Sequence, residues 1–416
     1  MINKLRQEFA LFKPIDFAIV INVIGLNFMK FVPIGLILLS LAFIYEFFFA
    51  KSTSFDFKTQ FSKRSFFVLS IPFFIAVIGL IYTTNYSKAF EDIGRLMPFV
   101  IFPFLLLCLS GTRKESLNKF VLFGFVIGLV IRFFLDFCES IEGYLYDYNI
   151  QIFFYSYLDS DTNILAIITM FGVLYLLDFL NITTPKSQQQ KFVLQGLVLF
   201  LSMCVLLLQS RIVILFFFAG LGLLFIRHWK NKRKWNIVFT AFFSGMLMLI
   251  PAFQGRFQVI STESQTITTT ELTHSSVIPI ENLPCMSSTQ LRFNSLKATW
   301  EIIKKNPVLG VGTGDWQDEL VKEYNTADMP CNAHEKTAPH NQYMRNLLKY
   351  GFIGLLIYLG YIFYFLRVFR IQPRYGQLPF LITLIFCGLG YDLLDVGSSA
   401  PIFAFFSTWL FFEDNK

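Results

Sequence analysis

The chain has 416 residues, of which 55% are hydrophobic and 15% charged, and its mean hydropathy of +0.56 excludes an ordinary water-soluble protein. The composition predicts an all-α polytopic membrane protein, because the apolar runs lack the alternation typical of a membrane β-barrel. The net charge of +7 does not indicate nucleic-acid binding, because the basic residues gather in alternate loops between the apolar runs.

Apolar runs that could cross a membrane begin near the N-terminus and continue to the C-terminus. We expect about twelve transmembrane helices, nine before residue 254 and three after residue 350. Several runs are shorter than the roughly 20 residues that an upright crossing needs, so the boundaries are approximate. The expected helices cover residues 15–29, 31–50, 65–82, 97–110, 120–137, 163–180, 192–209, 212–226, 236–253, 351–368, 378–389 and 398–412.

The Lys and Arg residues set the expected orientation of these helices, because such residues collect in cytoplasmic loops. With the N-terminus in the cytoplasm, the inner loops include the basic segments 51–64 and 227–234, whereas the outer segment 138–161 contains no Lys or Arg. We therefore expect both termini in the cytoplasm. His228, in the second basic segment, is then expected to flank a helix on the cytoplasmic side.

A long hydrophilic segment separates the ninth and tenth expected helices. It divides the chain into residues 1–253 with nine helices, an outer loop of residues 254–350, and residues 351–416 with three helices. Loops of this length without a function are uncommon, so we expect the functional site here.

A helix is expected inside the outer loop at residues 290–305, and a tight glycine-rich turn at residues 310–314. We expect the apolar stripe of this helix to lie along the membrane surface. The stripe consists of Phe293, Leu296, Trp300 and Ile303.

Cys285 and Cys331 are the two cysteines of the outer loop. In an oxidising compartment they could form a disulfide bond that joins the segments of Arg292 and His340. Two unrelated free thiols are an equal alternative, because pairing cannot be deduced from sequence.

His340 stands where the outer loop returns to the membrane, shortly before the helix expected at residues 351–368. A titratable imidazole beside a bilayer and near a helix start suits proton chemistry on a lipid-borne substrate. A zinc site with His334 is disfavoured, because two ligands on one helix face lie three or four positions apart and these histidines are six apart.

Charged residues near the expected helices supply further candidates. Arg211 lies between two apolar runs, where an unpaired charge would be costly, with an arginine that snorkels at a helix end as the alternative. Arg292 lies on the expected loop helix, with a solvated surface residue as the alternative. Asp392 and Asp395, before the last helix, are candidates for orienting His340, although solvated loop carboxylates are commoner.

Residues 82–95 form a further charged segment, which we expect to be a short amphipathic helix on the outer side. Lys88 and Arg95 could there line a groove for a substrate.

A spaced signature surrounds His340. His340 and Asn341 are followed by nine residues and then by Gly351 and Gly354. We expect the two glycines to let helices approach closely.

Two arginine features accompany this signature. Arg211 follows the polar Ser210 at the entry into an apolar run. Arg292 lies upstream of Trp300 and of an Asn-Pro-x-x-Gly-x-Gly turn at residues 306–312. Together with the His340 signature, these features resemble bacterial O-antigen ligases, within the wider superfamily that includes the O-antigen polymerases.

This resemblance implies a GT-C-like fold and a metal-independent, inverting glycosyltransferase of the bacterial inner membrane that needs no cofactor. Its members transfer a glycan from undecaprenyl pyrophosphate to an acceptor, here expected to be lipid A-core, on the periplasmic side. A histidine acts as general base, and arginines stabilise the pyrophosphate leaving group. The candidate catalytic residues are His340, Arg211 and Arg292, and the candidate substrate-binding residues are Asn341, Lys88, Arg95 and Trp300.

Two other functions remain open. A polymerase of the same superfamily would use the same donor with a second lipid-linked glycan as acceptor, although a single large loop followed by three helices favours the ligase. A transporter or flippase of lipid-linked sugars is disfavoured, because the charges lie mostly at expected helix ends and no internal repeat is found.

Overall fold

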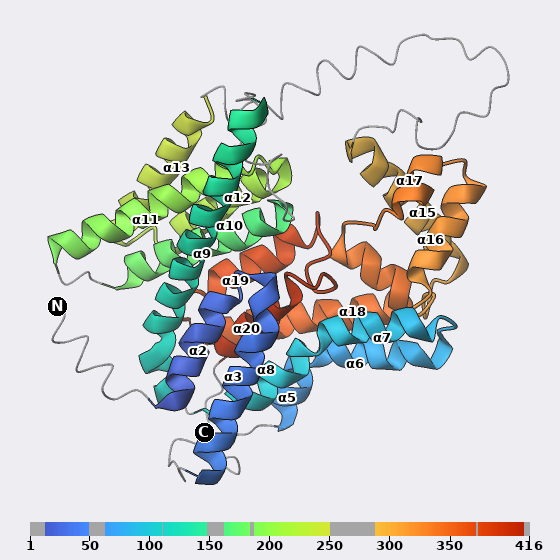
Figure 1. Cartoon of the computed structure of the whole chain (residues 1–416), viewed down its shortest axis with the longest axis horizontal. Helices are drawn as coiled ribbons and strands as arrows, with labels where there is room; N and C mark the ends of the chain where they lie inside the picture. Colours follow the sequence, from blue (N-terminus) through green and yellow to red (C-terminus); the bar gives the residue numbers. More distant parts are fainter. Residues whose placement is uncertain are drawn as a thin grey trace.

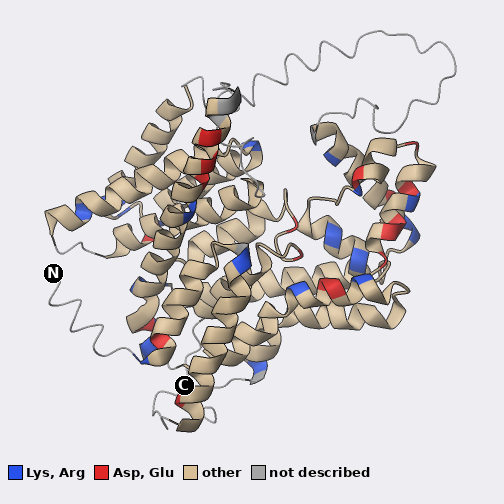
Figure 2. Cartoon of the chain, in the orientation of Figure 1, with Lys and Arg blue, Asp and Glu red and all other residues tan. Residues whose placement is uncertain are grey.

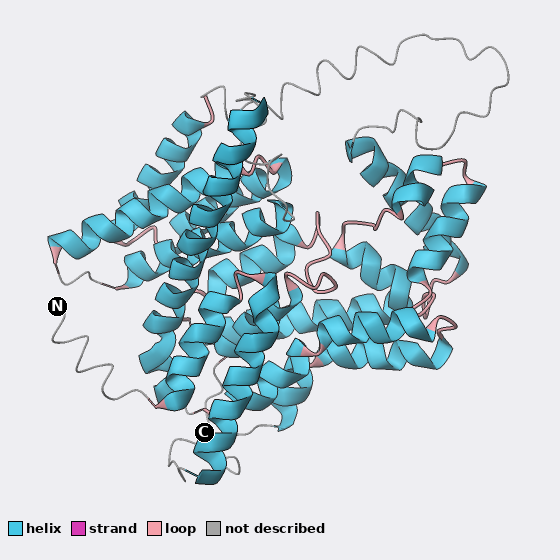
Figure 3. Cartoon of the chain, in the orientation of Figure 1, coloured by secondary structure: helices cyan, strands magenta, loops and turns pink. Residues whose placement is uncertain are grey.

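The computed structural model describes residues 13–49, 63–109, 111–147, 162–183, 187–249, 288–371 and 373–411. Every regular element in these ranges is a helix, as the composition predicts (Figure 1, Figure 3). Most of the helices pack into one bundle, and three helices of the expected outer loop stand beside it (Figure 1).

Prolines begin many of the helices in the first part of the chain. They occupy the first or second position of α2, α3, α6 and α8, where a backbone N–H is not needed for helical bonding. One consequence is that the run expected at residues 65–82 is divided at Ser70. The helices are α2 (Pro14–Gly25), α3 (Val32–Ile44), α5 (Lys63–Leu69), α6 (Ile71–Ile78), α7 (Tyr86–Leu96), α8 (Pro98–Leu106) and α9 (Gly111–Asp147).

Helix α10 is the centre of the bundle. Almost all of its side chains are buried, and it contacts α9, α11, α12, α13 and α19. Burial on all sides explains why its sequence is apolar around its whole circumference. The remaining helices are α10 (Thr162–Ile182), α11 (Gln188–Leu207), α12 (Arg211–Arg227), α13 (Trp235–Leu247), α15 (Ser288–Lys305), α16 (Trp316–Thr326), α17 (Pro330–Glu335), α18 (Gln342–Ile371), α19 (Gln377–Ile382) and α20 (Ala400–Trp409).

Five helical segments in the described ranges are long and apolar enough to cross a membrane. Large apolar side chains such as Phe49, Leu215 and Phe363 are exposed on the outside of the bundle, as expected of residues that face lipid. These features support a membrane protein. The other seven expected runs overlap shorter helices, so the count of twelve crossings stays a prediction. The five segments are Val32–Phe49, Arg113–Gly143, Thr162–Ile182, Gln188–Leu207 and Gln342–Ile371.

Helices α15, α16 and α17 form a small cluster with its own core. Ile302 of α15 packs with Trp316, Leu320 and Tyr324 of α16, and Leu348 of α18 joins them. Charged side chains are denser on this cluster and on α7 than in most of the bundle (Figure 2). Residues 288–350 of the expected outer loop therefore form a folded unit anchored to the beginning of α18.

The expected loop helix is present as α15, and the contact of its apolar stripe with a membrane surface stays a prediction. Of the stripe, Ile303 is buried, whereas Phe293 and Trp300 are exposed. The buried face includes two hydroxyl residues, because Ser295 Oγ donates to Ala338 O at 2.9 Å and Thr299 Oγ1 donates to Ser295 O at 2.7 Å. A pattern of apolar residues alone misses such positions.

Gly351 forms a kink within α18, with φ of 62° and ψ of −160°. The glycine-rich turn fits into this kink, because Val311 N and Gly312 N donate to the carbonyls of Leu348 and Lys349, each at 2.9 Å. A Cβ atom on Gly351 would lie 2.2 Å from Val308 O. Gly351 therefore receives a turn of the outer loop, and the expectation that it brings two helices together is wrong. Gly354 adjoins Tyr350 of its own helix.

The described cysteines divide into two kinds. Cys331 is disulfide-bonded, whereas Cys285, the other cysteine of the outer loop, lies outside the described residues. Cys108, Cys138, Cys204 and Cys387 are free.

Candidate active site

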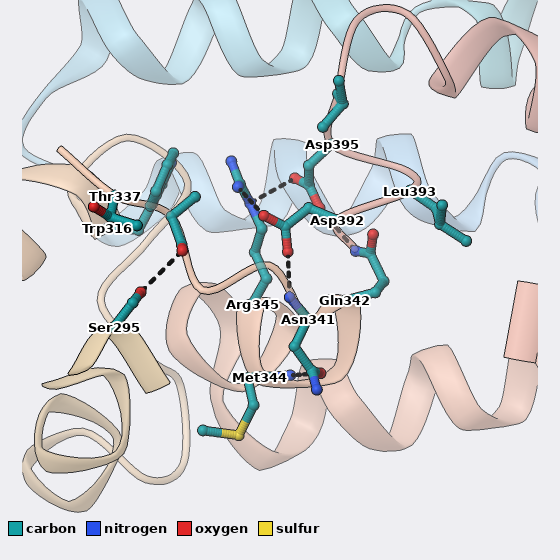
Figure 4. Close-up of polar contacts among 12 residues, drawn as sticks. Ser295, Trp316, Thr337, Asn341, Gln342, Met344, Arg345, Asp392, Leu393 and Asp395 are labelled. Carbon is teal, nitrogen blue, oxygen red and sulfur yellow. Dashed lines mark hydrogen bonds and ion pairs between the residues drawn. The ribbon is translucent and has the colours of Figure 1, made fainter. Parts of the chain in front are cut away.

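His340 lies in the connection between α17 and α18, two residues before α18 begins. It is partly buried, and its φ of 50° is unusual for a residue with a side chain. The next residue fixes this backbone: Asn341 N donates to Asp392 Oδ1 at 2.9 Å, and Asn341 Nδ2 donates to Leu389 O at 2.9 Å (Figure 4). Asn341 Oδ1 also accepts from Met344 N at 3.0 Å and so caps α18. His340 is thus held in a strained conformation of the kind found at functional sites.

Asp392 and Asp395 are buried, which excludes the alternative of solvated loop carboxylates. The second oxygen of Asp392 accepts from Arg345 Nη1 at 2.8 Å (Figure 4). Asp395 accepts from Gln342 Nε2 at 2.8 Å and from Lys349 Nζ at 2.6 Å. Burial by itself would raise the pKa of Asp395, but Lys349 and Arg345 hold this pKa well below its ordinary value.

Asp92 of α7 completes a group of charges that we call the buried charge cluster. Asp92 Oδ2 lies 2.9 Å from Lys349 Nζ and accepts from Trp316 Nε1 at 2.8 Å. Arg345 also lies over the Trp316 ring, with its Cζ atom 3.9 Å from the centroid. These contacts fix α7, α16 and the first turns of α18 together. The cluster consists of Asp92, Arg345, Lys349, Asp392 and Asp395.

Lys349 is fully buried and Arg345 nearly so in the first turns of α18, in a segment expected to belong to the outer loop. A sequence signal for them exists. Gln342, Arg345 and Lys349 are spaced three and four residues apart, so they share one face of a helix whose other faces are largely apolar.

Tyr391 brings the two candidate arginines toward this loop. Arg292 Cζ of α15 lies 5.1 Å from the centroid of the Tyr391 ring. The Tyr391 hydroxyl lies 3.0 Å from Ser210 Oγ, and Ser210 directly precedes Arg211, the first residue of α12. Tyr391 adjoins Asp392, and Asp392 binds Asn341, the residue after His340. The segments that carry Arg211, Arg292 and His340 therefore meet at residues 391–392.

The other candidate binding residues are placed less centrally. Lys88 Nζ pairs with Glu91 of its own helix at 2.8 Å. Arg95 pairs with Glu91 and, at 3.2 Å, with Asp92, through which it touches the buried charge cluster. Trp300 projects from α15 with 49% of its surface exposed. Much of the positive charge expected of an α7 groove is thus balanced by carboxylates on that helix.

The described part of the chain contains no group of three or more His, Cys, Asp and Glu side chains that could hold a metal ion. His334 is exposed at the end of α17.

Comparison with known proteins identifies a family for the middle of the chain. Residues 196–359 match the family model described as O-antigen ligase. This segment runs from α11 into α18 and contains Arg211, Arg292, His340 and Gly351, whereas Asp92, Asp392 and Asp395 lie outside it. No curated protein matches the chain. Residues 196–359 of the chain are therefore similar to the O-antigen ligase family.

Proposed function

We propose that the protein is an inverting glycosyltransferase that moves a glycan from undecaprenyl pyrophosphate to lipid A-core without a metal ion. The observation that carries this proposal is the meeting of the segments of Arg211, Arg292 and His340 at residues 391–392. A base and two permanent cations are the groups that displacement of a pyrophosphate from a sugar requires.

His340 is the general base in this proposal. It takes the proton from an acceptor hydroxyl as that oxygen forms a bond to the anomeric carbon of the donor. The bond between the anomeric carbon and the pyrophosphate oxygen breaks, and the electron pair leaves with the pyrophosphate. Attack opposite the leaving group inverts the anomeric configuration.

Arg211 and Arg292 stabilise the departing pyrophosphate. Guanidinium groups form bidentate hydrogen bonds to phosphate and keep their charge throughout the reaction. Arg211 occupies the first position of α12, so the unbonded N–H groups of that helix end favour the same anion.

The surroundings of His340 favour the neutral imidazole that a base requires. The positive end of the α18 dipole disfavours a second positive charge nearby. Asp392 would have the opposite effect, but Arg345 balances its charge at 2.8 Å. Asn341 fixes the loop that carries His340 through its hydrogen bonds to Asp392 and Leu389. The same bonds would hold Asn341 itself in place beside a substrate.

The proposed site lies on the periplasmic side of the inner membrane, with both chain termini in the cytoplasm. The excess of Lys and Arg in alternate loops supports this orientation. The kink at Gly351 supports the division of the chain at residue 350, because α18 changes direction there between the outer loop and the expected membrane helix.

Replacement of His340 by Ala tests the proposal. We expect transfer by purified protein to fall at least about 100-fold, the usual contribution of a general base. His334→Ala, at an exposed histidine of α17, is the matched control and should keep full transfer. Membrane insertion and the thermal stability of both variants are measured in parallel. Full transfer by the His340→Ala variant would contradict the proposal.

The same assay separates the alternative functions when it offers lipid-linked glycan together with different acceptors. Transfer to lipid A-core identifies a ligase. Growth of the lipid-linked glycan identifies a polymerase, and the absence of both products favours transport.

A further inference from the structure

We propose that Tyr391 is a positioning residue that holds the Arg292 guanidinium by its face and leaves the N–H groups of that guanidinium available for a pyrophosphate. This inference rests on the proposed function and extends it to a residue outside the segment that matches the family model.

Arg345 and Arg292 are held in chemically different ways. Arg345 donates to the carboxylate of Asp392 at 2.8 Å, and its Nε lies 3.7 Å from Asp395 Oδ1. Its charge is therefore balanced inside the protein. The contact that the structure gives Arg292 is instead to the face of the Tyr391 ring, at 5.1 Å from the centroid.

An aromatic ring suits a guanidinium that must bind an anion. A carboxylate partner would occupy two of the five N–H donors and would cancel the charge. A ring attracts the flat face of the guanidinium through its quadrupole, while the N–H donors at the edge stay free for another acceptor. Tyr391 can thus orient Arg292 without competing with the phosphate oxygens.

The hydroxyl of Tyr391 fixes the ring from the other side. It donates to Asn163 Oδ1 of α10 at 2.9 Å, and Ser210 Oγ lies 3.0 Å away. The neighbouring Gly390 is close to α12, since a Cβ atom there would lie 2.9 Å from Ile212 Cγ2. Tyr391 is 5% exposed, so its ring cannot turn into solvent.

The ring and the hydroxyl therefore predict separate effects. Tyr391→Leu removes both, whereas Tyr391→Phe keeps the ring contact with Arg292 and removes only the bonds to Ser210 and Asn163. We expect Tyr391→Leu to lower kcat/KM for the lipid-linked donor about 10-fold. Tyr391→Phe should restore most of that loss.

A double-mutant cycle with Arg292→Ala distinguishes positioning from a general effect on folding. Tyr391→Leu should lower kcat/KM in the wild-type background and have less than a twofold effect when Arg292 is already Ala. Equal losses in both backgrounds would overturn the proposal, because Tyr391 would then act independently of Arg292. Thermal unfolding of each purified variant identifies losses of transfer that come from unfolding. If Tyr391→Leu fails to fold, kcat/KM is measured with Tyr391→Phe instead.

Two patterns of results distinguish a failure of the role proposed for Tyr391 from a failure of the proposed function. Loss of transfer in His340→Ala and Arg292→Ala together with equal effects of Tyr391→Leu in both backgrounds overturns only the role of Tyr391. Full transfer by Arg292→Ala overturns both the role of Tyr391 and the assignment of Arg292 to the leaving group.

Discussion

Helices α10, α12 and α18 each carry polar residues near both ends, and the two ends differ in how these residues are used. At one end, Asp178 of α10 accepts from His228 Nε2 at 2.8 Å and from Gly376 N at 3.0 Å, and lies 3.3 Å from Arg227 Nη1. At the other end, Asn163 of α10 binds Tyr391. Asp178 follows Asn163 by fifteen positions, which corresponds to about 22 Å of helix.

The comparison separates charges that hold the fold from charges that we propose serve a substrate. The His228 end ties α10, α12 and the connection before α19 together through one fully buried carboxylate. The His340 end contains a similar set of buried pairs in the buried charge cluster, and adds Arg292 against a ring face. Burial and pairing alone therefore do not mark a site. A cation over an aromatic ring does not mark one either, because Lys234 Nζ lies 4.4 Å from the centroid of the Trp229 ring at the His228 end.

The structure adds to the expectation for His228. This residue directly follows α12, as expected of a flanking residue, but it is also buried and bonded to Asp178. The signal that was available is Asp178 itself, a carboxylate within the apolar run expected at residues 163–180.

The largest expected effect lies at the His340 end, in the pair of Asp395 and Lys349. Asp395→Leu should lower the free energy of unfolding by about 4 kcal/mol, because removal of one partner leaves a buried charge poorly compensated. Equilibrium unfolding of the purified protein in detergent measures this change. The double variant Asp395→Leu/Lys349→Met should recover part of the loss, and a single variant as stable as the wild type would contradict the structural role of this pair.

A smaller effect is expected at the His228 end, where it sharpens the comparison. Asp178→Asn should lower the free energy of unfolding by about 3 kcal/mol, because His228 and Arg227 lose a charged partner. Transfer per folded molecule should stay unchanged, since the site lies about 22 Å away. Unfolding and transfer assays on the same preparation measure both quantities. A parallel loss of transfer would show that the two ends are coupled, and the contrast between them would then fail.

The smallest of these effects is expected at the kink of α18. Gly351→Ala should cost about 2 kcal/mol of unfolding free energy, because φ of 62° is unfavourable for alanine and the new Cβ would lie 2.2 Å from Val308 O. Gly360→Ala is the matched control, since a Cβ at this position of the same helix meets no heavy atom within 4 Å. Thermal unfolding of both variants checks the difference. Equal stability of the two would show that the kink is not enforced by Gly351.

The fold was predictable to the extent that it depends on local composition. Apolar runs indicated the helices, and even the charged pair of Arg132 and Asp136 follows from its spacing of one helical turn, with 2.8 Å between Nε and Oδ1. The break at Ser70 was missed, although Pro72 could have suggested it, because a proline at the second helical position also occurs in unbroken runs.

The candidate site was predictable only where a spaced signature exists. His340, Arg211 and Arg292 were found through such spacing, whereas the partnership of Asp92 with Lys349 joins residues more than 250 positions apart. No local pattern reveals a contact of that kind, because it depends on which helices become neighbours in the folded chain. Gly351 shows a related difficulty, since glycine suits a kink and a close helix contact equally well.

The turn that fits into α18 at Gly351 has a consequence for how a substrate reaches the protein. Separating the α15–α17 cluster from α18 would break the bonds from Val311 N, Gly312 N and Phe352 N, and backbone groups left without a partner are costly. These bonds oppose a hinged opening of this unit. In the proposed function, a glycan would therefore meet a preassembled surface, and its binding energy would not be spent on ordering that surface.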